Sequence, residues 1–309
     1  MNNKKILVLG GTGFIGYHIL KRAVEFNMDA TSISKNKPKL MRQISDVKYV
    51  YTDMTEANNV KKILSKDYNF IINSSGYVDH RSYFAAGNNI INQHFTITKN
   101  IIDFANRESL ELFINLGSSD EYGNIASPQY EYSREQPFSP YSFAKTISAH
   151  FLEMIYKNEN FPCTTLRLFL TYGPYQDKNR LIPQIIQGCL KNRNFPTSGG
   201  KQIRDFCYVE DLVDAIFLSF NNHKIFGKTY NLGSSQPANV KSIIELIRSI
   251  VQKGKPIFGQ IPYRKGENME LYPNTERIKK DLNWTPKTTL ENGLKSTIEW
   301  YMKNEEAFS

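Results

Sequence analysis

Residues 5–20, KILVLGGTGFIGYHIL, join an apolar run, a glycine-rich turn and a segment of helical periodicity in direct succession. The run Ile6–Leu9 is apolar throughout, as in a parallel strand that is buried on both faces. Behind the glycines, Ile15, Ile19 and Ala23 recur at the spacing of one helix face. A strand, a tight turn and a helix in this order predict the first unit of a doubly wound α/β fold.

The glycines of this turn indicate what it binds. Gly10 permits the tight turn, Gly13 lets the backbone approach a pyrophosphate, and Gly16 allows the helix to pack closely on the strand. The helix begins near Phe14 and Ile15, and its free N–H groups and positive dipole end face the phosphates. Because the strand and the helix both flank the glycines, we interpret the stretch as a dinucleotide-binding turn.

The composition narrows the class of protein. A chain of 309 residues with 40% apolar and 13% aromatic residues is globular and can bury a large core. Its 39 Lys and Arg residues against 30 Asp and Glu give a net charge of +9, but no arginine-rich run accompanies them, so nucleic acid is not an expected partner. No apolar run approaches the ~18 residues of a membrane helix. The three cysteines have no metal-ligand spacing and indicate packing thiols in a reducing compartment. We expect a cytoplasmic protein with neither membrane contact nor a metal site.

The end of the second expected strand bears on the choice of cofactor. This strand, Asp29–Ser34, leads into Lys35 instead of the acidic residue that would bind the ribose hydroxyls of NAD. A serine followed by a cation suits a 2′-phosphate. The sequence therefore predicts NAD(P) binding and favours NADP(H) over NAD(H).

The next two strands also end in residues that we assign to the cofactor. Asp53 and Met54 follow the third strand, at 47–51, where the adenine would lie. Asp53 is also expected to be the N-cap of a helix over 55–64. Ser74 follows the fourth strand and is small enough for the cofactor to approach the backbone.

The fifth strand, 112–116, ends in a polar loop that contains Ser118, Ser119 and Asp120. Ligands bind at the carboxyl ends of the strands in an open parallel sheet, so we place these side chains near the substrate. His80 lies in the segment after the fourth strand, which faces the same edge. We assign it no chemical role.

A tyrosine and a lysine follow on one helix face. Ser139 and a proline predict the start of this helix, and Tyr141 and Lys145 are four residues apart. An ammonium beside a phenol favours the phenolate and is expected to lower its pKa, which gives a proton-transfer group near neutral pH. A hydroxyl from Ser118 or Ser119 would hold the same substrate oxygen.

Several motifs in fixed order identify a family. The sequence resembles the extended short-chain dehydrogenase/reductases that act on nucleotide-linked sugars, and the resemblance covers nearly the whole chain. The motifs are GGTGFIG (10–16), GSSDEYG (117–123), YSFAK (141–145), LRLFLTYGPYQ (166–176), NRLIP (179–183), IRDFCYVEDLVDA (203–215), YNLGS (230–234), YRKGENM (263–269) and DLNWTP (281–286).

The resemblance implies a role for each matching residue. Tyr141 is the acid/base, Lys145 lowers its pKa and binds the nicotinamide ribose, and Ser118 assists, with Ser119 as the alternative. Contacts to the nucleotide diphosphate and its ribose are implied for Asn179, Arg204, Arg264 and Glu267.

The sequence also departs from the family pattern. Leu170 stands where an asparagine often precedes the YGP motif, and His94 stands where another asparagine would lie. Asp120 occupies the position that is glutamate in 4,6-dehydratases, so a shorter carboxylate would have to reach the C5 proton of the sugar. Dehydration is therefore the third choice among the reactions below.

The resemblance implies a Rossmann-type doubly wound parallel sheet with a smaller, discontinuous C-terminal substrate lobe. Residues 1–172 and about 209–232 would form the dinucleotide-binding domain, and residues from about 173 to 208 and from 233 to 309 the nucleotide-sugar-binding lobe. A homodimer through the Tyr141 helix and its neighbour is also implied.

The expected reaction is hydride transfer at C4 of a nucleotide-diphosphate sugar. A 4-keto-sugar reductase or 4-dehydrogenase is the first choice, and a 4-epimerase is the second. A cofactor-binding regulator without activity is disfavoured, because Tyr141 and Lys145 are both present.

Overall fold

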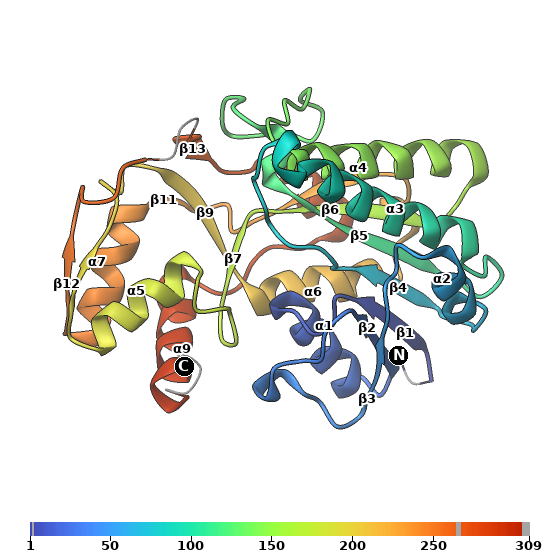
Figure 1. Cartoon of the computed structure of the whole chain (residues 1–309), viewed down its shortest axis with the longest axis horizontal. Coiled ribbons are helices and arrows are strands. Elements are labelled where there is room, and N and C mark those ends of the chain that lie inside the picture. The colour runs from blue at the N-terminus through green and yellow to red at the C-terminus, as the bar shows by residue number, and fades with distance from the viewer. Residues whose placement is uncertain (2, 264–266, 305–309) are drawn as a thin grey trace.

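The computed structural model describes residues 1, 3–263 and 267–304. Its largest element is a seven-stranded sheet in which every neighbouring pair is parallel (Figure 1). In spatial order the strands are β10 (Thr229–Leu232), β6 (Cys163–Leu168), β5 (Leu112–Ser118), β4 (Phe70–Asn73), β1 (Lys5–Leu9), β2 (Asp29–Ser34) and β3 (Val47–Tyr51). The strand order reverses between β1 and β4, which is where such sheets form a ligand crevice. The predicted doubly wound sheet is confirmed.

Helices cover both faces of this sheet. Ile6 and Val8 of β1 share a core with one group of helices, and Leu7 and Leu9 share another core on the opposite face. Since alternate side chains of a strand point to opposite faces, burial on both sides explains the unbroken apolar run. The first group is α1 (Phe14–Glu25), α6 (Val209–Ser219) and α8 (Glu276–Leu282), and the second is α2 (Ala57–Leu64), α3 (Asn88–Phe104) and α4 (Pro140–Glu159).

Smaller sheets and three helices lie beside the large sheet, on the left of Figure 1. The helices share a separate core that includes Ile186, Ile243 and Leu294. They are α5 (Leu181–Leu190), α7 (Val240–Val251) and α9 (Leu290–Lys303). The strands are β7 (Leu170–Tyr172), β9 (Ile203–Tyr208), β11 (Pro237–Asn239) and β13 (Glu270–Leu271) in one sheet, and β8 (Asn194–Pro196) and β12 (Lys255–Ile257) in the other. The exact division into two lobes stays a prediction.

The chain enters the smaller part and then returns to the large sheet. After β6 it forms β7, α5, β8 and β9, and α6 and β10 then bring it back. β10 pairs with β6 at the sheet edge, with Thr229 opposite Thr165.

Local sequence signals match the structure at several element boundaries. β2 and β3 begin and end at the residues expected from the sequence. Ser139 caps α4, because its hydroxyl accepts the Ser142 N–H, while the Ser142 hydroxyl accepts the Ser139 N–H. The N-cap expected at Asp53 is wrong: α2 begins after Glu56, and Asp53 instead accepts hydrogen bonds from Thr55. Within the described residues, no helix has the length and apolarity to span a bilayer.

Candidate active site

The glycine turn brings three backbone segments closer than side chains would permit. Gly10 has a φ of +77°, and a Cβ there would lie 2.7 Å from the Ser74 carbonyl oxygen. A Cβ on Gly16 would lie 2.3 Å from the Gly10 oxygen. α1 starts at Phe14 behind the N-cap Gly13, which has no side chain to cap the free N–H groups. This open helix N-terminus fits a diphosphate.

Two of the expected cofactor serines lie against this turn. Ser74 donates its hydroxyl to the Leu9 carbonyl at 2.6 Å, so it closes the end of β1 onto the end of β4. The Ser34 hydroxyl oxygen lies 3.4 Å from the Thr12 nitrogen and accepts its N–H. Both side chains fix the walls of the crevice between the strand ends.

Lys35 is paired with a carboxylate. Its Nζ lies 2.8 Å from Oδ2 of Asp53. Burial favours the neutral form of Asp53, but Lys35 and the two Thr55 donors offset it, so the pKa of this carboxyl is lowered. The segment is held in place by Asn100, whose amide donates to the carbonyls of Met54 and Thr55 at 3.0 and 3.1 Å.

The fold brings Ser118, Tyr141 and Lys145 together. Ser118 ends β5, and the other two lie in the first turns of α4, which packs against β5. The Ser118 side chain lies close enough to the Tyr141 hydroxyl to lower the pKa of the phenol by hydrogen bonding. The Lys145 ammonium donates to the Leu116 carbonyl at 2.8 Å. A phenol, a hydroxyl and a lysine side chain therefore lie at one strand end.

The pKa of Tyr141 differs from the sequence expectation. Burial raises it above its ordinary value, the Asp120 carboxylate raises it further, and the Ser118 hydrogen bond only partly opposes this. Burial also lowers the pKa of Lys145 to about 8. Each group loses hydration on burial and therefore favours its neutral form, so the lowering of the Tyr141 pKa expected from the ammonium is wrong for the chain alone.

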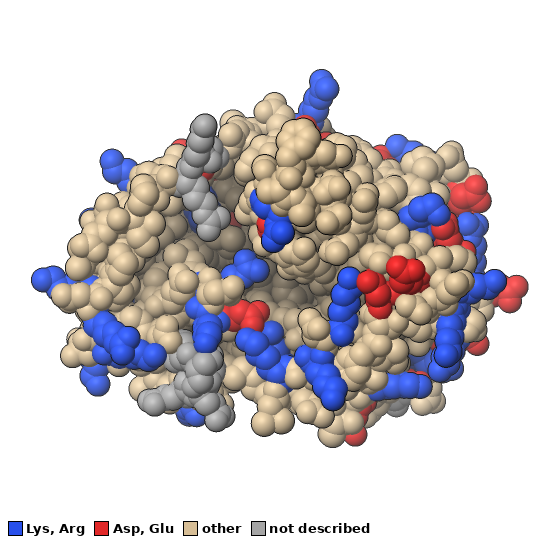
Figure 2. Space-filling view, viewed as in Figure 1, with Lys and Arg blue, Asp and Glu red and all other residues tan. Residues whose placement is uncertain are grey.

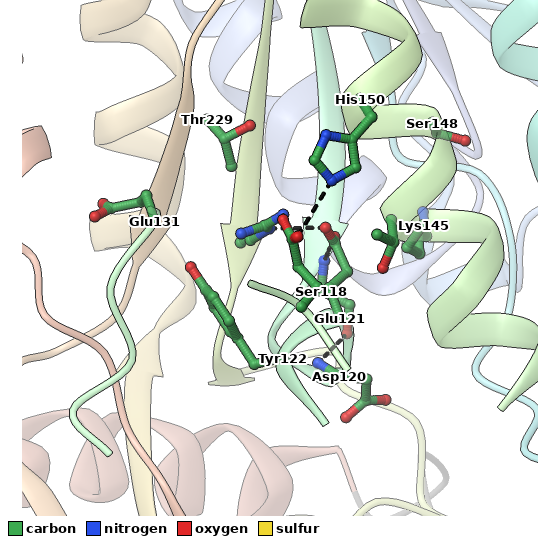
Figure 3. A network of polar contacts seen from close by, with 12 residues as sticks. Ser118, Asp120, Glu121, Tyr122, Glu131, Lys145, Ser148, His150 and Thr229 are labelled. Carbon is green, nitrogen blue, oxygen red and sulfur yellow. Dashed lines mark hydrogen bonds and ion pairs between the residues drawn. The ribbon is translucent and has the colours of Figure 1, made fainter. Parts of the chain in front are cut away.

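The two carboxylates of the loop after β5 have different surroundings. Glu121 is fully buried, where it pairs with Arg167 at 2.7 Å and accepts the Ser118 N–H at 2.8 Å. Figure 3 shows the carboxylate of Asp120 turned away from the network in which Glu121 takes part. Ser119 is buried in a 3₁₀ turn over Ser119–Tyr122. Ser118, rather than Ser119, is the serine whose side chain acts on the Tyr141 hydroxyl.

The expected substrate residues come from the smaller sheets and their loops. Nη2 of Arg204, on β9, lies 2.6 Å from Oε1 of Glu267 and also donates to the Asn268 carbonyl. Asn179 is exposed in the turn before α5. Arg264 lies outside the described residues. Figure 2 shows the surface hollowed between the side with α5 and α7 and the side with the large sheet, with Lys and Arg side chains at the rim.

The sequence interpretation missed two side chains near Tyr141. The charge of Arg180, next to Asn179, acts on the Tyr141 hydroxyl. The His80 ring lies edge-on to the Tyr141 ring, with 5.9 Å between centroids. His80 follows β4, and the loop with Ser118 follows the neighbouring strand β5, so both lie at carboxyl ends of the sheet. This was the sequence signal that could have pointed to His80.

The sequence matches a known protein family over most of its length. A model described as "NAD dependent epimerase/dehydratase family" matches residues 6–233. The chain belongs to this family. It is therefore an NAD-dependent enzyme, and the resemblance to the extended short-chain dehydrogenase/reductases that act on nucleotide-linked sugars is confirmed.

Individual relatives span almost the whole enzyme. The dTDP-glucose 4,6-dehydratase 1 of Escherichia coli K12 is 28% identical over 338 residues, covering 97% of this chain and 93% of the relative. The solved UDP-glucose 4-epimerase of Thermotoga maritima superposes with a TM-score of 0.88 at 23% identity, covering 97% and 99% of the two chains. The dTDP-glucose 4,6-dehydratase of Bacillus anthracis in complex with NAD superposes with a TM-score of 0.85 at 23% identity, covering 98% of each chain. The two solved structures share the fold of the enzyme.

Proposed function

We propose that the enzyme transfers a hydride between C4 of a nucleotide-linked sugar and a nicotinamide cofactor, with reduction of a 4-keto sugar, or its reverse, as the net reaction. The observation that carries this proposal is the grouping of Ser118, Tyr141 and Lys145 at the end of β5. It supplies a proton donor and an oxygen-binding hydroxyl where ligands bind on such sheets.

Each of these side chains has a distinct role. Tyr141 gives a proton to the C4 oxygen during reduction or removes it during oxidation. Ser118, whose side chain acts on the Tyr141 hydroxyl, holds the same oxygen. Lys145 binds the nicotinamide ribose and adds positive charge near the phenol. The cofactor, when bound, supplies the hydride-carrying carbon and, in its oxidised form, a positive charge that favours the phenolate.

The residues that the smaller sheets and their loops contribute suit a nucleoside diphosphate. A guanidinium fork such as that of Arg204 matches phosphate oxygens, and the Glu267 carboxylate can accept from ribose hydroxyls. Because Arg204 and Glu267 are 2.6 Å apart, each holds the other in position. Asn179 adds an amide from the turn before α5. The named relatives act on dTDP-linked and UDP-linked sugars, which supports the same substrate class here.

A second candidate reaction is 4,6-dehydration, which the Escherichia coli relative favours. It needs further proton transfers beyond those at C4. Of the two loop carboxylates, Glu121 is paired with Arg167 and accepts the Ser118 N–H. Asp120 is shorter than the glutamate that 4,6-dehydratases have at its position. This is why we place reduction first.

The cofactor that we propose is NAD(H). The family is described as NAD dependent, and the Bacillus anthracis structure contains NAD. The NADP(H) preference expected from Lys35 finds no support, because Asp53 neutralises that ammonium at 2.8 Å.

The test is the Tyr141→Phe variant, assayed on a panel of UDP-, dTDP-, GDP- and CDP-linked sugars and their 4-keto forms. Loss of the phenol proton is expected to lower turnover by about 10²–10⁴-fold while NAD binding stays within twofold of the wild type. Tyr132→Phe, at a tyrosine that is 82% exposed, is the control. Full activity in Tyr141→Phe would overturn the proposal, and product analysis separates reduction, 4-epimerisation and dehydration.

We further propose a cytoplasmic homodimer that pairs through α3 and α4. Phe143 and Met154, on α4, are 45% and 43% exposed, which is apolar surface that a second copy would cover. Phe143→Glu is expected to convert the dimer to a monomer in size-exclusion chromatography with light scattering. A wild-type monomer would contradict this.

A further inference from the structure

His80 lies at the candidate active site although the sequence gave it no role. Its ring is edge-on to Tyr141, with 5.9 Å between centroids and an interplanar angle of 89°. Its Nε2 lies 3.6 Å from Oδ2 of Asp120. The opposite ring nitrogen, Nδ1, lies 3.4 Å from the Ser139 hydroxyl oxygen. The imidazole is thus held between the N-cap of α4 and the carboxylate of the loop after β5.

The His80 ring is partly open to solvent. The side chains of His80 and Asp120 are 32% and 27% exposed. Phe138 stacks on the imidazole, with planes 14° apart, and limits its rotation. His94, the other histidine beside Tyr141, is different: it is buried, and burial together with the Lys145 charge lowers its pKa to about 3. His80 is therefore the one of these two whose ring is open to a ligand.

The two ring nitrogens of His80 face different groups. Nδ1 lies against the N-cap of α4, where the hydroxyl oxygens of Ser139 and Ser142 are 3.0 Å apart. Nε2 faces Asp120 and is the nitrogen that we assign to proton transfer.

We propose that His80, supported by Asp120, is a second proton-transfer residue of this site and acts on a carbon next to C4 of the sugar. The inference rests on the proposed function, because a ketone at C4 is what makes the hydrogens on C3 and C5 acidic. Tyr141 serves the C4 oxygen, and the imidazole beside it serves the neighbouring carbon. The nearby carboxylate stabilises the imidazolium that forms.

The step balances without an added oxidant or reductant. Nε2 takes the C3 or C5 hydrogen as a proton, and the electron pair of that C–H bond forms a C=C bond to C4. The C4 oxygen receives the negative charge, which the Tyr141 and Ser118 hydroxyls stabilise by hydrogen bonding. Return of a proton from His80 restores the ketone. In deuterated water this step replaces the carbon-bound hydrogen with deuterium.

The test measures two reactions of the cofactor-loaded enzyme in parallel. NMR follows deuterium uptake at C3 and C5 of UDP- and dTDP-linked 4-keto-6-deoxyhexoses in D₂O, against a sample without enzyme. The absorbance of the reduced nicotinamide follows hydride transfer at C4. His80→Gln is expected to lower deuterium uptake by about 10²-fold or more while C4 hydride transfer stays within about threefold. His150→Gln is the matched control, because that exposed histidine also pairs with a carboxylate, Glu135, at 3.2 Å.

The outcomes separate the two proposals. Absence of C4 hydride transfer by the wild type would overturn the proposed function, and this inference with it. Hydride transfer without deuterium uptake by the wild type would overturn the inference alone. Undiminished uptake in His80→Gln, or equal loss of both reactions, would also overturn it, because His80 would then have no role specific to this step. Asp120→Asn should lower uptake in the same direction if the carboxylate supports the imidazolium.

Discussion

Arg167 and Glu121 form an ion pair with 2.7 Å between Nε and Oε2, and both side chains are buried. The other carboxylate oxygen of Glu121 accepts the Ser118 N–H at 2.8 Å. This ion pair lies near the carboxyl end of β5 and thereby fixes the backbone of Ser118. Glu135 also pairs with Arg167 and is joined by His150 at the surface of α4 (Figure 3).

Breaking this pair should destabilise the fold. Arg167→Met leaves Glu121 buried without a counter-charge, and we expect the free energy of unfolding to fall by about 3–5 kcal/mol. Urea denaturation followed by circular dichroism measures it. The double variant Arg167→Met/Glu121→Gln should recover part of the loss, since no charge is then left unpaired at Glu121. A single variant as stable as the wild type would contradict the role assigned to the pair.

Gly76 and His94 should be energetically coupled. A Cβ on Gly76 would lie 2.0 Å from Cε1 of His94, and the φ of Gly76 is +105°. Gly76→Ala should therefore cost on the order of 2 kcal/mol or more, through the clash and the strained backbone together. In a double-mutant cycle, His94→Asn should recover the stability that the clash costs but not the stability that the strained φ costs. Additive effects would show that the ring moves aside freely.

The buried ammonium of Lys145 should make stability depend on pH. Its pKa is about 8 in the folded enzyme against 10.5 for an ordinary lysine, so between these values the unfolded chain binds a proton that the folded chain has released. The free energy of unfolding therefore rises with pH in this window, by at most about 1.4 kcal/mol per unit from this group. Urea denaturation between about pH 8 and 10, compared with Lys145→Met, isolates the effect because other groups titrate in both proteins. Parallel curves would mean that the lysine stays protonated when buried.

Cofactor choice should respond to the residues after β2. The double variant Ser34→Asp/Lys35→Asn adds a carboxylate that can accept from ribose hydroxyls and repel a 2′-phosphate. We expect the ratio of NAD to NADP affinity, measured by calorimetry, to rise by about tenfold or more, which corresponds to about 1.4 kcal/mol. Lys37→Asn, two residues farther along, is the control. An unchanged ratio would place the selecting contact elsewhere.

The sequence predicted those parts of the fold whose cause is local. An unbroken apolar strand, the positive φ of Gly10 and the Ser139 cap each depend on a few neighbouring residues, and each is found as expected. Asp53 was misassigned as a cap because α2 begins only after Glu56; Asp53 instead accepts from Thr55 and pairs with Lys35, which comes from a neighbouring strand end. Proximity of that kind depends on the assembled sheet.

The same reason limits what the sequence could say about the site. Ser118, Tyr141 and Lys145 were found because two motifs carry them. His80 was passed over because its contacts to Asp120 and Tyr141 join three separate segments. The direction of the Tyr141 pKa was wrong because burial and the Asp120 carboxylate both raise it, and both depend on the folded molecule.

The position of β10 at the edge of the large sheet has a consequence during synthesis. As the chain leaves the ribosome, β6 is complete well before Thr229–Leu232 exist to hydrogen-bond with it. For that interval the nascent protein carries an open strand edge with unpaired backbone groups, the kind of surface that recruits other unfinished chains. A fragment ending at residue 172 would keep this exposed edge permanently, so an isolated nucleotide-binding half needs the later strand grafted back onto it.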